Sequence, residues 1–157
     1  MISYAFEIVS GEAAAGTADV DATAGLATIT LDRPDKLNAL NAQALRELDA
    51  AYARAQQDGA RAVLLRGAGR AFCAGRDISD VDPATDDVTG LLDGLVAPLM
   101  RRIAACPAPT FAAAHGACLG VGLGLLIATD VVYVADDAKI GSPFAALGAT
   151  LDSGGHA

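Results

Sequence analysis

The sequence predicts an α/β fold built on a mostly parallel sheet. Short apolar runs that suit buried strands alternate along the chain with longer runs that carry an apolar stripe at helical spacing. Apolar residues make up 53% of the chain and charged residues 19%, a balance typical of a globular protein. At 157 residues the chain is long enough to bury a sizeable core, so we assign residues 1–157 to one domain.

The first two strands are expected to form a hairpin. Residues 4–9 alternate in the manner of a half-buried strand, and residues 26–31 (Leu-Ala-Thr-Ile-Thr-Leu) form the returning strand. The segment between them, residues 10–24, is rich in Gly, Ala, Thr and Asp and is predicted to be the hairpin tip. Pro34 and Asn38 then break the chain into a loop.

A helix is predicted over residues 41–57, with Asn41 as its N-cap. One stripe of this helix is apolar and should face the core: Leu45, Leu48 and Tyr52. Asp58 and Gly59 end it, and residues 62–66 (Ala-Val-Leu-Leu-Arg) are predicted to be a buried strand.

The second half continues the alternation of strands and helices, which favours right-handed crossovers. Residues 81–89 are acidic and contain Pro83, so we expect a mobile surface loop. A helix should follow over residues 88–105, bent or broken by Pro98. The remaining expected elements are a strand over residues 110–114, a small-residue helix over 119–128, closed by Asp130, and a buried strand over 131–135.

The charge distribution argues against nucleic acid as a partner. The formal net charge is −8, and Lys36 and Lys139 are the only lysines. Five cationic residues nevertheless lie in or beside the loops described below: Arg33, Lys36, Arg66, Arg70 and Arg76. They either hold a small anionic ligand or are solvated loop ends.

The three cysteines, Cys73, Cys106 and Cys118, show no C-x-x-C spacing and predict neither a disulfide framework nor a metal site. Cys73 and Cys118 lie among small apolar residues and are expected to be core fillers. No signal-like segment opens the sequence, and the apolar run 111–128 contains His115 and is closed by Asp130. We therefore expect no membrane association and a reduced, cytoplasmic location.

Two glycine-containing turns, residues 70–78 and 115–122, are the most informative segments. Each follows an apolar strand and precedes a helix-like run, so its backbone N–H groups can point into open space. Two such turns in one domain suggest an oxyanion hole built from main chain. His115 itself is expected to be a structural hydrogen-bonding residue.

Together with residues 33–41 (Arg-Pro-Asp-Lys-Leu-Asn-Ala-Leu-Asn), these turns resemble the ordered motifs of the enoyl-CoA hydratase/isomerase (crotonase) family. The resemblance implies a spiral of ββα turns, an acyl-CoA thioester as substrate, and no cofactor besides the coenzyme A that the substrate carries. The family's helical C-terminal region, which packs across a trimer, is missing after residue 157. We therefore expect a truncated version of the fold, and a homotrimer or hexamer for a full-length protein.

The resemblance assigns the two oxyanion donors to the backbone N–H groups of Arg76 and Val121, where Val121 replaces the usual glycine. It also implies a set of residues that contact the substrate and its coenzyme A: Lys36, Leu37, Ala74, Arg76, Asp77, Ile78, Ser79 and Val121. Asp77 lies in the first turn, so capping is expected of it rather than base catalysis.

The acid and base positions depart from the family pattern. Hydratases of the family use two glutamates, and the matching positions are Gly124 and Phe144, neither of which can move a proton. Asp152 matches the position of a proton-shuttling aspartate in some isomerases of the family. One carboxylate suffices to carry a proton between two carbons of one substrate, so the sequence favours double-bond isomerisation over hydration. Asp152 could equally cap a following helix.

Two alternatives to an enzyme remain. A non-catalytic acyl-CoA-binding relative would explain Gly124, Phe144 and the bulky Val121. A dinucleotide-binding domain would use the glycines of residues 120–124, but that fingerprint requires a third glycine where the chain has Leu125.

Overall fold

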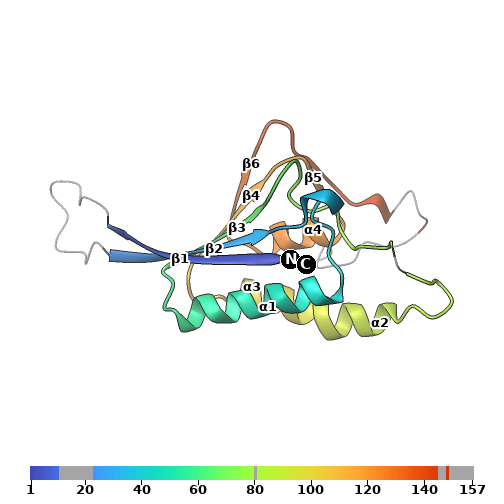
Figure 1. Cartoon of the computed structure of the whole chain (residues 1–157), viewed down its shortest axis with the longest axis horizontal. Helices are drawn as coiled ribbons and strands as arrows, with labels where there is room; N and C mark the ends of the chain where they lie inside the picture. Colours follow the sequence, from blue (N-terminus) through green and yellow to red (C-terminus); the bar gives the residue numbers. More distant parts are fainter. Residues whose placement is uncertain (11–22, 80, 145–147, 149–157) are drawn as a thin grey trace.

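Five strands form the main sheet of the protein, in the order β1–β2–β3–β4–β6 (Figure 1). The structure is a computed structural model and describes residues 1–10, 23–79, 81–144 and 148. The hairpin tip expected at residues 10–24 therefore lies mostly outside the described residues. The strands are β1 (Ile2–Ser10), β2 (Thr23–Leu31), β3 (Ala62–Gly67), β4 (Thr110–Ala114) and β6 (Val131–Val134).

The strand directions agree with the predicted mostly parallel sheet. β1 pairs antiparallel with β2, and the β2–β3, β3–β4 and β4–β6 pairs are all parallel. The register places Ile29 beside Leu65 and Leu65 beside Ala112. All three side chains are completely buried, so this row of residues across β2, β3 and β4 is part of the hydrophobic core.

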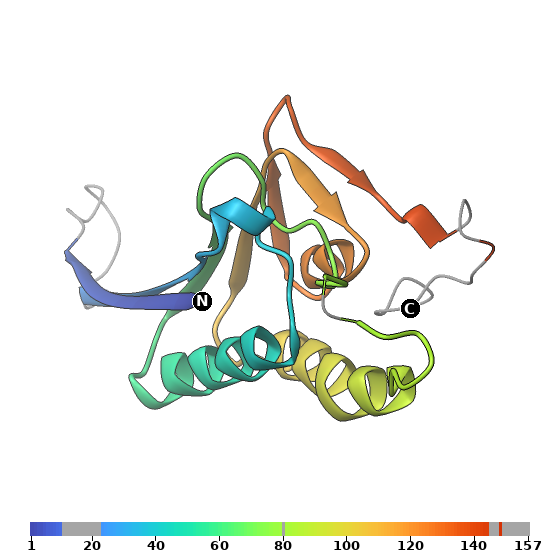
Figure 2. The same ribbon diagram turned by 45° about the vertical axis from the view of Figure 1, so that its right-hand side comes forward.

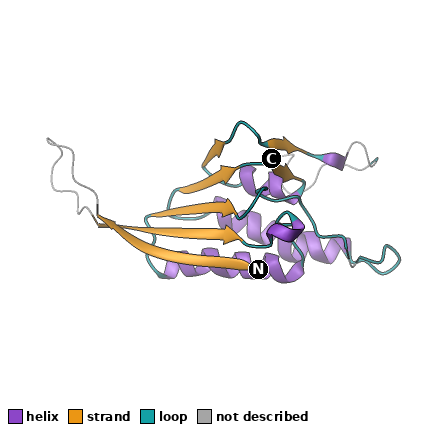
Figure 3. Ribbon diagram, turned by 45° about the horizontal axis from the view of Figure 1, so that its top comes forward, coloured by secondary structure: helices purple, strands orange, loops and turns teal. Residues whose placement is uncertain are grey.

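Two helical segments lie along one side of the sheet and meet beneath it (Figures 2 and 3). The first is α1 (Ala42–Gln57), whose predicted N-cap is confirmed because the side chain of Asn41 accepts a hydrogen bond from the N–H of Ala44 at 2.9 Å. Its apolar stripe is buried against the sheet, as predicted: Leu45, Leu48 and Tyr52. The second segment consists of α2 (Val88–Leu91), η2 (Leu92–Val96) and α3 (Ala97–Ala104).

The helix expected over residues 88–105 is interrupted, and Pro98 explains where. η2 is a π-helical turn that ends just before α3, in which Pro98 occupies one of the first two positions. Proline has no backbone N–H and cannot continue a regular α-helical ladder, but it fits the first turn of a new helix. The chain therefore keeps its direction through a widened turn, in which the N–H of Ala97 donates to the carbonyl of Leu92.

A second, smaller sheet was not predicted. It pairs β5 (Ala117–Leu119) in parallel with β7 (Lys139–Gly141). Because Leu119 is paired with Gly141 in this sheet, the helix expected from residue 119 begins later, as α4 (Val121–Ile127). Asp130 does not close that helix: its carboxylate accepts hydrogen bonds from the N–H and the hydroxyl of Thr110, both at 2.7 Å, and so ties the start of β6 to β4.

The prediction of a buried strand over residues 131–135 was wrong in its burial. β6 is formed, but Val131, Tyr133 and Val134 are 41%, 64% and 57% exposed. Within the described residues β6 pairs with β4 alone, so β6 is an edge strand with few packing partners. The Tyr133 ring stacks on the ring of Phe111, with 6.4 Å between the ring centroids. A run of β-branched residues marks a strand, but whether both of its faces are covered depends on distant segments.

None of the helices in the described part of the chain combines the length and the apolar character that a membrane crossing requires. Cys73 and Cys118 are completely buried and make a β-bridge with each other through their backbones, which confirms them as core residues.

Candidate functional site

The loop before α1 contains two residues in the left-handed region, Leu37 (φ 51°) and Asn38 (φ 58°). Asn38 is buried, and its side chain makes three hydrogen bonds. Its Nδ2 donates to the carbonyls of Ala68 at 2.8 Å and Ala71 at 2.7 Å, and its Oδ1 accepts from the N–H of Arg33 at 2.8 Å. This side chain therefore fastens the loop before α1 (33–41) to the chain that enters the first glycine turn.

The first turn holds the peptide between Gly75 and Arg76 in one orientation. The N–H of Leu40 donates to the carbonyl of Gly75 at 2.8 Å, and the N–H of Asp77 donates to the carbonyl of Leu40 at 2.9 Å. The carbonyl and N–H of a trans peptide point in opposite directions, so the Arg76 N–H points away from Leu40. Gly75 has φ +104°, a backbone conformation that would be strained in any residue with a side chain.

The second turn holds the peptide between Gly120 and Val121 in a similar way. The carbonyl of Gly120 accepts the first hydrogen bond of α4, from the N–H of Gly124 at 3.1 Å. The N–H of Val121 therefore points out of the start of the helix, where it has no partner within the helix. Within the described part of the chain, neither the Arg76 N–H nor the Val121 N–H donates to a backbone carbonyl.

The two turns are packed against each other. The N–H of Cys73 donates to the carbonyl of Ala117, and the N–H of Leu119 donates to the carbonyl of Cys73, both at 2.9 Å. A Cβ atom on Gly75 would lie 3.0 Å from the carbonyl oxygen of Leu119, and one on Gly122 would lie 2.5 Å from the carbonyl oxygen of Cys73. Glycine at both positions is what allows the backbones to approach this closely.

His115 has the structural role expected of it. Its Nε2 lies 3.0 Å from the carbonyl oxygen of Gly69, and its own carbonyl accepts from the N–H of Phe72 at 2.8 Å. The imidazole thus links the end of β4 to the backbone just before the first turn, and its Nε2 already has a hydrogen-bond partner.

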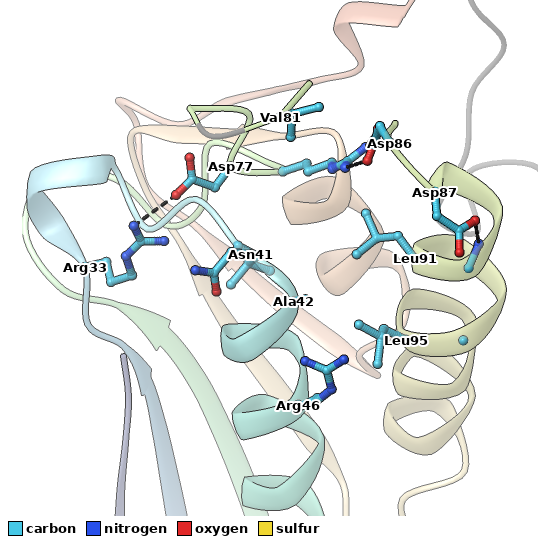
Figure 4. A pocket seen from close by; sticks show the side chains of 14 residues that line it. Arg33, Asn41, Ala42, Arg46, Asp77, Val81, Asp86, Asp87, Leu91 and Leu95 are labelled. Atoms are coloured by element: carbon cyan, nitrogen blue, oxygen red, sulfur yellow. Dashed lines mark hydrogen bonds and ion pairs between the residues drawn. The ribbon is translucent and has the colours of Figure 1, made fainter. Parts of the chain in front are cut away.

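A cavity of about 710 Å³ opens between the N-terminal half of α1 and the α2–η2 segment (Figure 4). The walls combine charged side chains with three leucines, and they include Arg33, Leu40, Arg76, Asp77, Asp86 and Leu91. Because Arg76 and Leu40 belong to the wall, the cavity reaches the first glycine turn.

Two of the five loop cations are neutralised by carboxylates. Arg33 pairs with Asp77 at 2.9 Å, and Arg76 makes a two-pronged ion pair with Asp86 through contacts of 2.8 and 2.5 Å. Arg66 donates to the hydroxyl of Thr30 at 3.1 Å. The positive charge that the sequence places around these loops is therefore partly cancelled within the fold, which the spacing of the residues did not reveal.

Asp77 caps the first turn, as predicted, and also carries an ion pair that was not predicted. Its carboxylate accepts hydrogen bonds from the hydroxyl and the N–H of Ser79. These bonds, followed by the Arg33 guanidinium, lower the pKa of Asp77 to about 2, against the burial that opposes ionisation. Asp77 therefore stays ionised near neutral pH as a structural carboxylate and is unsuited to act as a base there.

The residues expected to contact coenzyme A are brought together. The N–H of Ala74 donates to the carbonyl of Leu37 at 3.0 Å, and the ammonium of Lys36 lies 3.5 Å from the hydroxyl of Ser79. Ile78 is 72% exposed, which leaves an apolar side chain open to a ligand at the same edge. Val121 joins this group through the contact between the two turns.

The positions that lack glutamate also lie at the site. Gly124 is buried within α4, and the ring of Phe144 would lie 3.9 Å from a Cβ atom on Gly120. Phe144 thus stands beside the second turn with an apolar ring. Asp152 lies outside the described residues. Among the residues that are described, no cluster of His, Cys, Asp or Glu has the composition of a metal site.

Two important residues were not anticipated. The sequence predicts only that Asn38 breaks the chain into a loop, although an asparagine beside a Pro-Asp-Lys-Leu segment is a candidate for the left-handed conformation. Asp86 was one of several acidic residues in a surface loop, and nothing in the local sequence distinguishes it from its neighbours.

Comparison with known proteins agrees with the motif order. The model of the enoyl-CoA hydratase/isomerase family matches residues 21–157. A protein of Rhodobacter capsulatus named "Probable enoyl-CoA hydratase" is 44% identical over 131 residues, which cover 83% of this chain and 51% of that protein. The 1,2-epoxyphenylacetyl-CoA isomerase of Escherichia coli is 38% identical over 136 residues, which cover 83% of this chain and 52% of that protein.

Solved structures show the same relationship. An enoyl-CoA hydratase/carnithine racemase of Magnetospirillum magneticum superposes with a TM-score of 0.73 and 35% identity, over 80% of this chain and 49% of that chain. An enoyl-CoA hydratase of Thermoplasma volcanium gives a TM-score of 0.69 and 31% identity, over 78% of this chain and 50% of that chain. The chain spans about half the length of these relatives.

Proposed function

The chain belongs to the enoyl-CoA hydratase/isomerase family, and from this premise we propose that it binds an acyl-CoA thioester and moves a carbon–carbon double bond within the acyl group. The observation that carries the proposal is the pair of packed glycine turns, each with an oriented N–H that has no backbone partner in the described residues. The thioester carbonyl would lie between the N–H groups of Arg76 and Val121.

This arrangement suits a reaction that passes through an enolate. Removing a proton from the α-carbon of a thioester moves negative charge onto the carbonyl oxygen. Two fixed N–H donors stabilise that charge more strongly than they bind the neutral carbonyl, and loss of one such donor typically costs about 3 kcal/mol. Neither donor needs a particular side chain, so Arg76 and Val121 are both acceptable.

The proposed proton carrier is Asp152. Its carboxylate would take the α-proton of a 3-enoyl-CoA, and the electron pair of that C–H bond would enter the enolate. The enolate then collapses so that the double bond lies between the α- and β-carbons, and the same proton is delivered to the γ-carbon. Hydration would require a second group to activate water, and Gly124 and Phe144 offer none at the family's glutamate positions.

Coenzyme A would lie along the edge where the loop before α1 meets the first turn, contacting Lys36, Leu37, Ala74, Ile78 and Ser79. The proximity of Lys36 to Ser79 and of Leu37 to Ala74 supports this placement. No cofactor is invoked besides the coenzyme A of the substrate. A cytoplasmic location and assembly of the longer protein into a homotrimer or hexamer remain part of the proposal.

A non-catalytic acyl-CoA-binding protein is the alternative, and the apolar Phe144 beside the second turn is the observation that favours it. Such a protein would use the same two N–H groups to hold a thioester without moving a proton. The E. coli relative supports the catalytic choice, since its name identifies an isomerase of a coenzyme A ester.

The test is the variant Asp152→Asn, with Asp136→Asn as the matched control because Asp136 is an exposed turn residue that does not line the cavity. We expect Asp152→Asn to abolish conversion of a 3-enoyl-CoA to the 2-enoyl isomer while its Kd for the ester stays within about twofold of the parent protein. Unchanged turnover in this variant would remove Asp152 from the mechanism.

A further inference from the structure

Asp86 stands at the junction between the first glycine turn and the second helical segment. Its carboxylate receives both terminal nitrogens of the Arg76 guanidinium, at 2.8 and 2.5 Å, while its carbonyl accepts from the N–H of Val88, the first residue of α2. The two side chains are 26% and 17% exposed, so the pair is largely shielded from water. The pair thus connects the turn directly to the start of α2.

The pairing has the geometry of a strong ion pair. A guanidinium presents two parallel N–H groups that match the two oxygens of a carboxylate, and such a fork fixes orientation as well as distance. Its hydrogen bonds raise the pKa of Arg76 and lower the pKa of Asp86, so each group favours its charged form.

The ion pair adds to the constraints on the backbone beside Arg76. Gly75 can adopt many conformations, and rotation of the peptide between Gly75 and Arg76 would turn the N–H away from the site. Two hydrogen bonds resist that rotation: the N–H of Leu40 donates to the carbonyl of Gly75, and the N–H of Asp77 donates to the carbonyl of Leu40. The side chain of Arg76 adds a further constraint, because its guanidinium is ion-paired with Asp86 in the wall of the cavity.

We propose that Asp86 is a positioning residue for catalysis: through its ion pair with the Arg76 side chain it holds the Arg76 backbone N–H in the orientation that polarises the thioester carbonyl. The inference rests on the proposed function, because it assumes that this N–H contacts the substrate. Asp86 acts through Arg76 and does not touch the reacting atoms. The same link keeps Leu91, which follows on α2, at the wall of the cavity opposite α1.

The experiment measures carbonyl polarisation directly, without turnover. Butanoyl-CoA labelled with carbon-13 at its carbonyl has no double bond to move, and hydrogen bonds to that oxygen shift its NMR resonance downfield on binding. The variants are Asp86→Asn, which keeps the shape and loses the charge, and Asp86→Glu, which keeps the carboxylate. The matched control is Asp82→Asn, an exposed carboxylate of the same loop that does not line the cavity.

We expect the bound-state shift to fall by about half in Asp86→Asn while the Kd for butanoyl-CoA stays within about twofold, because the lost interaction concerns orientation. Asp86→Glu should recover most of the shift, and Asp82→Asn should match the parent protein. In turnover of a 3-enoyl-CoA, kcat should fall about tenfold in Asp86→Asn with little change in KM. A purely structural role would alter the Kd or the thermal midpoint and leave the shift of the bound fraction unchanged.

The variant Arg76→Met tests the pair from its other end, since it removes the guanidinium and keeps the backbone N–H. The double variant Arg76→Met/Asp86→Asn should be no worse than either single variant, because both remove the same ion pair. Additive losses, or a parent-like shift in Asp86→Asn, would overturn the inference. A parent protein that binds butanoyl-CoA without any shift would instead refute the proposed use of the two N–H groups, and this inference with it.

Discussion

Replacing Asn38 with alanine is expected to be among the most damaging single changes in the site region. The side chain is buried and lies between the loop before α1 and the chain that enters the first turn. Its amide donates to the carbonyls of Ala68 and Ala71, and its oxygen accepts from the N–H of Arg33. The backbone is also left-handed, which suits asparagine better than alanine.

The cost follows from these contacts. Each of the three hydrogen bonds contributes about 1 kcal/mol net, and the buried Ala71 carbonyl would lose its side-chain donor. Holding alanine in the left-handed region adds about 1 kcal/mol. The free energy of unfolding should therefore fall by about 4 kcal/mol, which corresponds to a fall in Tm of roughly 10 °C for a domain of this size.

Urea unfolding followed by circular dichroism measures the change, with Asn41→Ala as the comparison. That variant removes one N-cap hydrogen bond and should cost only about 1 kcal/mol. Asn38→Asp should be at least as damaging as Asn38→Ala near neutral pH, since it brings a carboxylate against two carbonyls. If Asn38→Ala lowers the free energy of unfolding by no more than Asn41→Ala does, Asn38 is not the link between the loop before α1 and the chain that enters the first turn.

Three further predictions concern packing, pH and thiol access. Gly122→Ala should lower the free energy of unfolding in urea by about 2 kcal/mol, because the new Cβ would lie 2.5 Å from the Cys73 carbonyl oxygen; Gly141→Ala, which meets open space, should change it much less. The pKa of Asp77 is about 2 in the folded protein against an ordinary value of 3.8, so its ionised carboxylate stabilises the fold above about pH 4 and loses that contribution as the pH falls toward 2. In the variant Asp77→Asn, the free energy of unfolding should therefore depend less on pH between 4 and 2. A thiol reagent should modify Cys106 in the folded protein, whereas Cys73 and Cys118 are buried and should react only after unfolding; burial also raises the pKa of the Cys73 thiol to about 12. Rapid labelling of all three cysteines in the folded protein would contradict the assignment of Cys73 and Cys118 to the core.

The elements that the sequence predicted well are those whose signals are local. The N-cap at Asn41 and the apolar stripe that follows it define α1 without reference to the rest of the chain. The apolar run of β3 likewise marks a buried strand. The two glycine turns are predicted because each glycine-containing segment lies between an apolar run and a helix-like run, and Gly75 and Gly120 do adopt a positive φ.

The features that escaped prediction depend on partners far along the chain. The apolar run of β6 predicts a buried strand, yet the exposure of that strand is decided by which segments pack on it. Arg33 and Asp77 are 44 positions apart, and a sequence shows which residues carry charge but not which of them meet. For the same reason, the sequence of the acidic loop does not show that Asp86 forms an ion pair with Arg76.

The measurement that tests the central proposal most directly is proton NMR of a 3-enoyl-CoA incubated with the protein in D2O. We predict conversion to the 2-enoyl isomer, or incorporation of deuterium at the α-carbon, because either requires an enolate held by the Arg76 and Val121 N–H groups and a group that moves the proton. Unchanged spectra from an ester whose line broadening shows it to be bound would contradict the proposal and identify the chain as a binding protein.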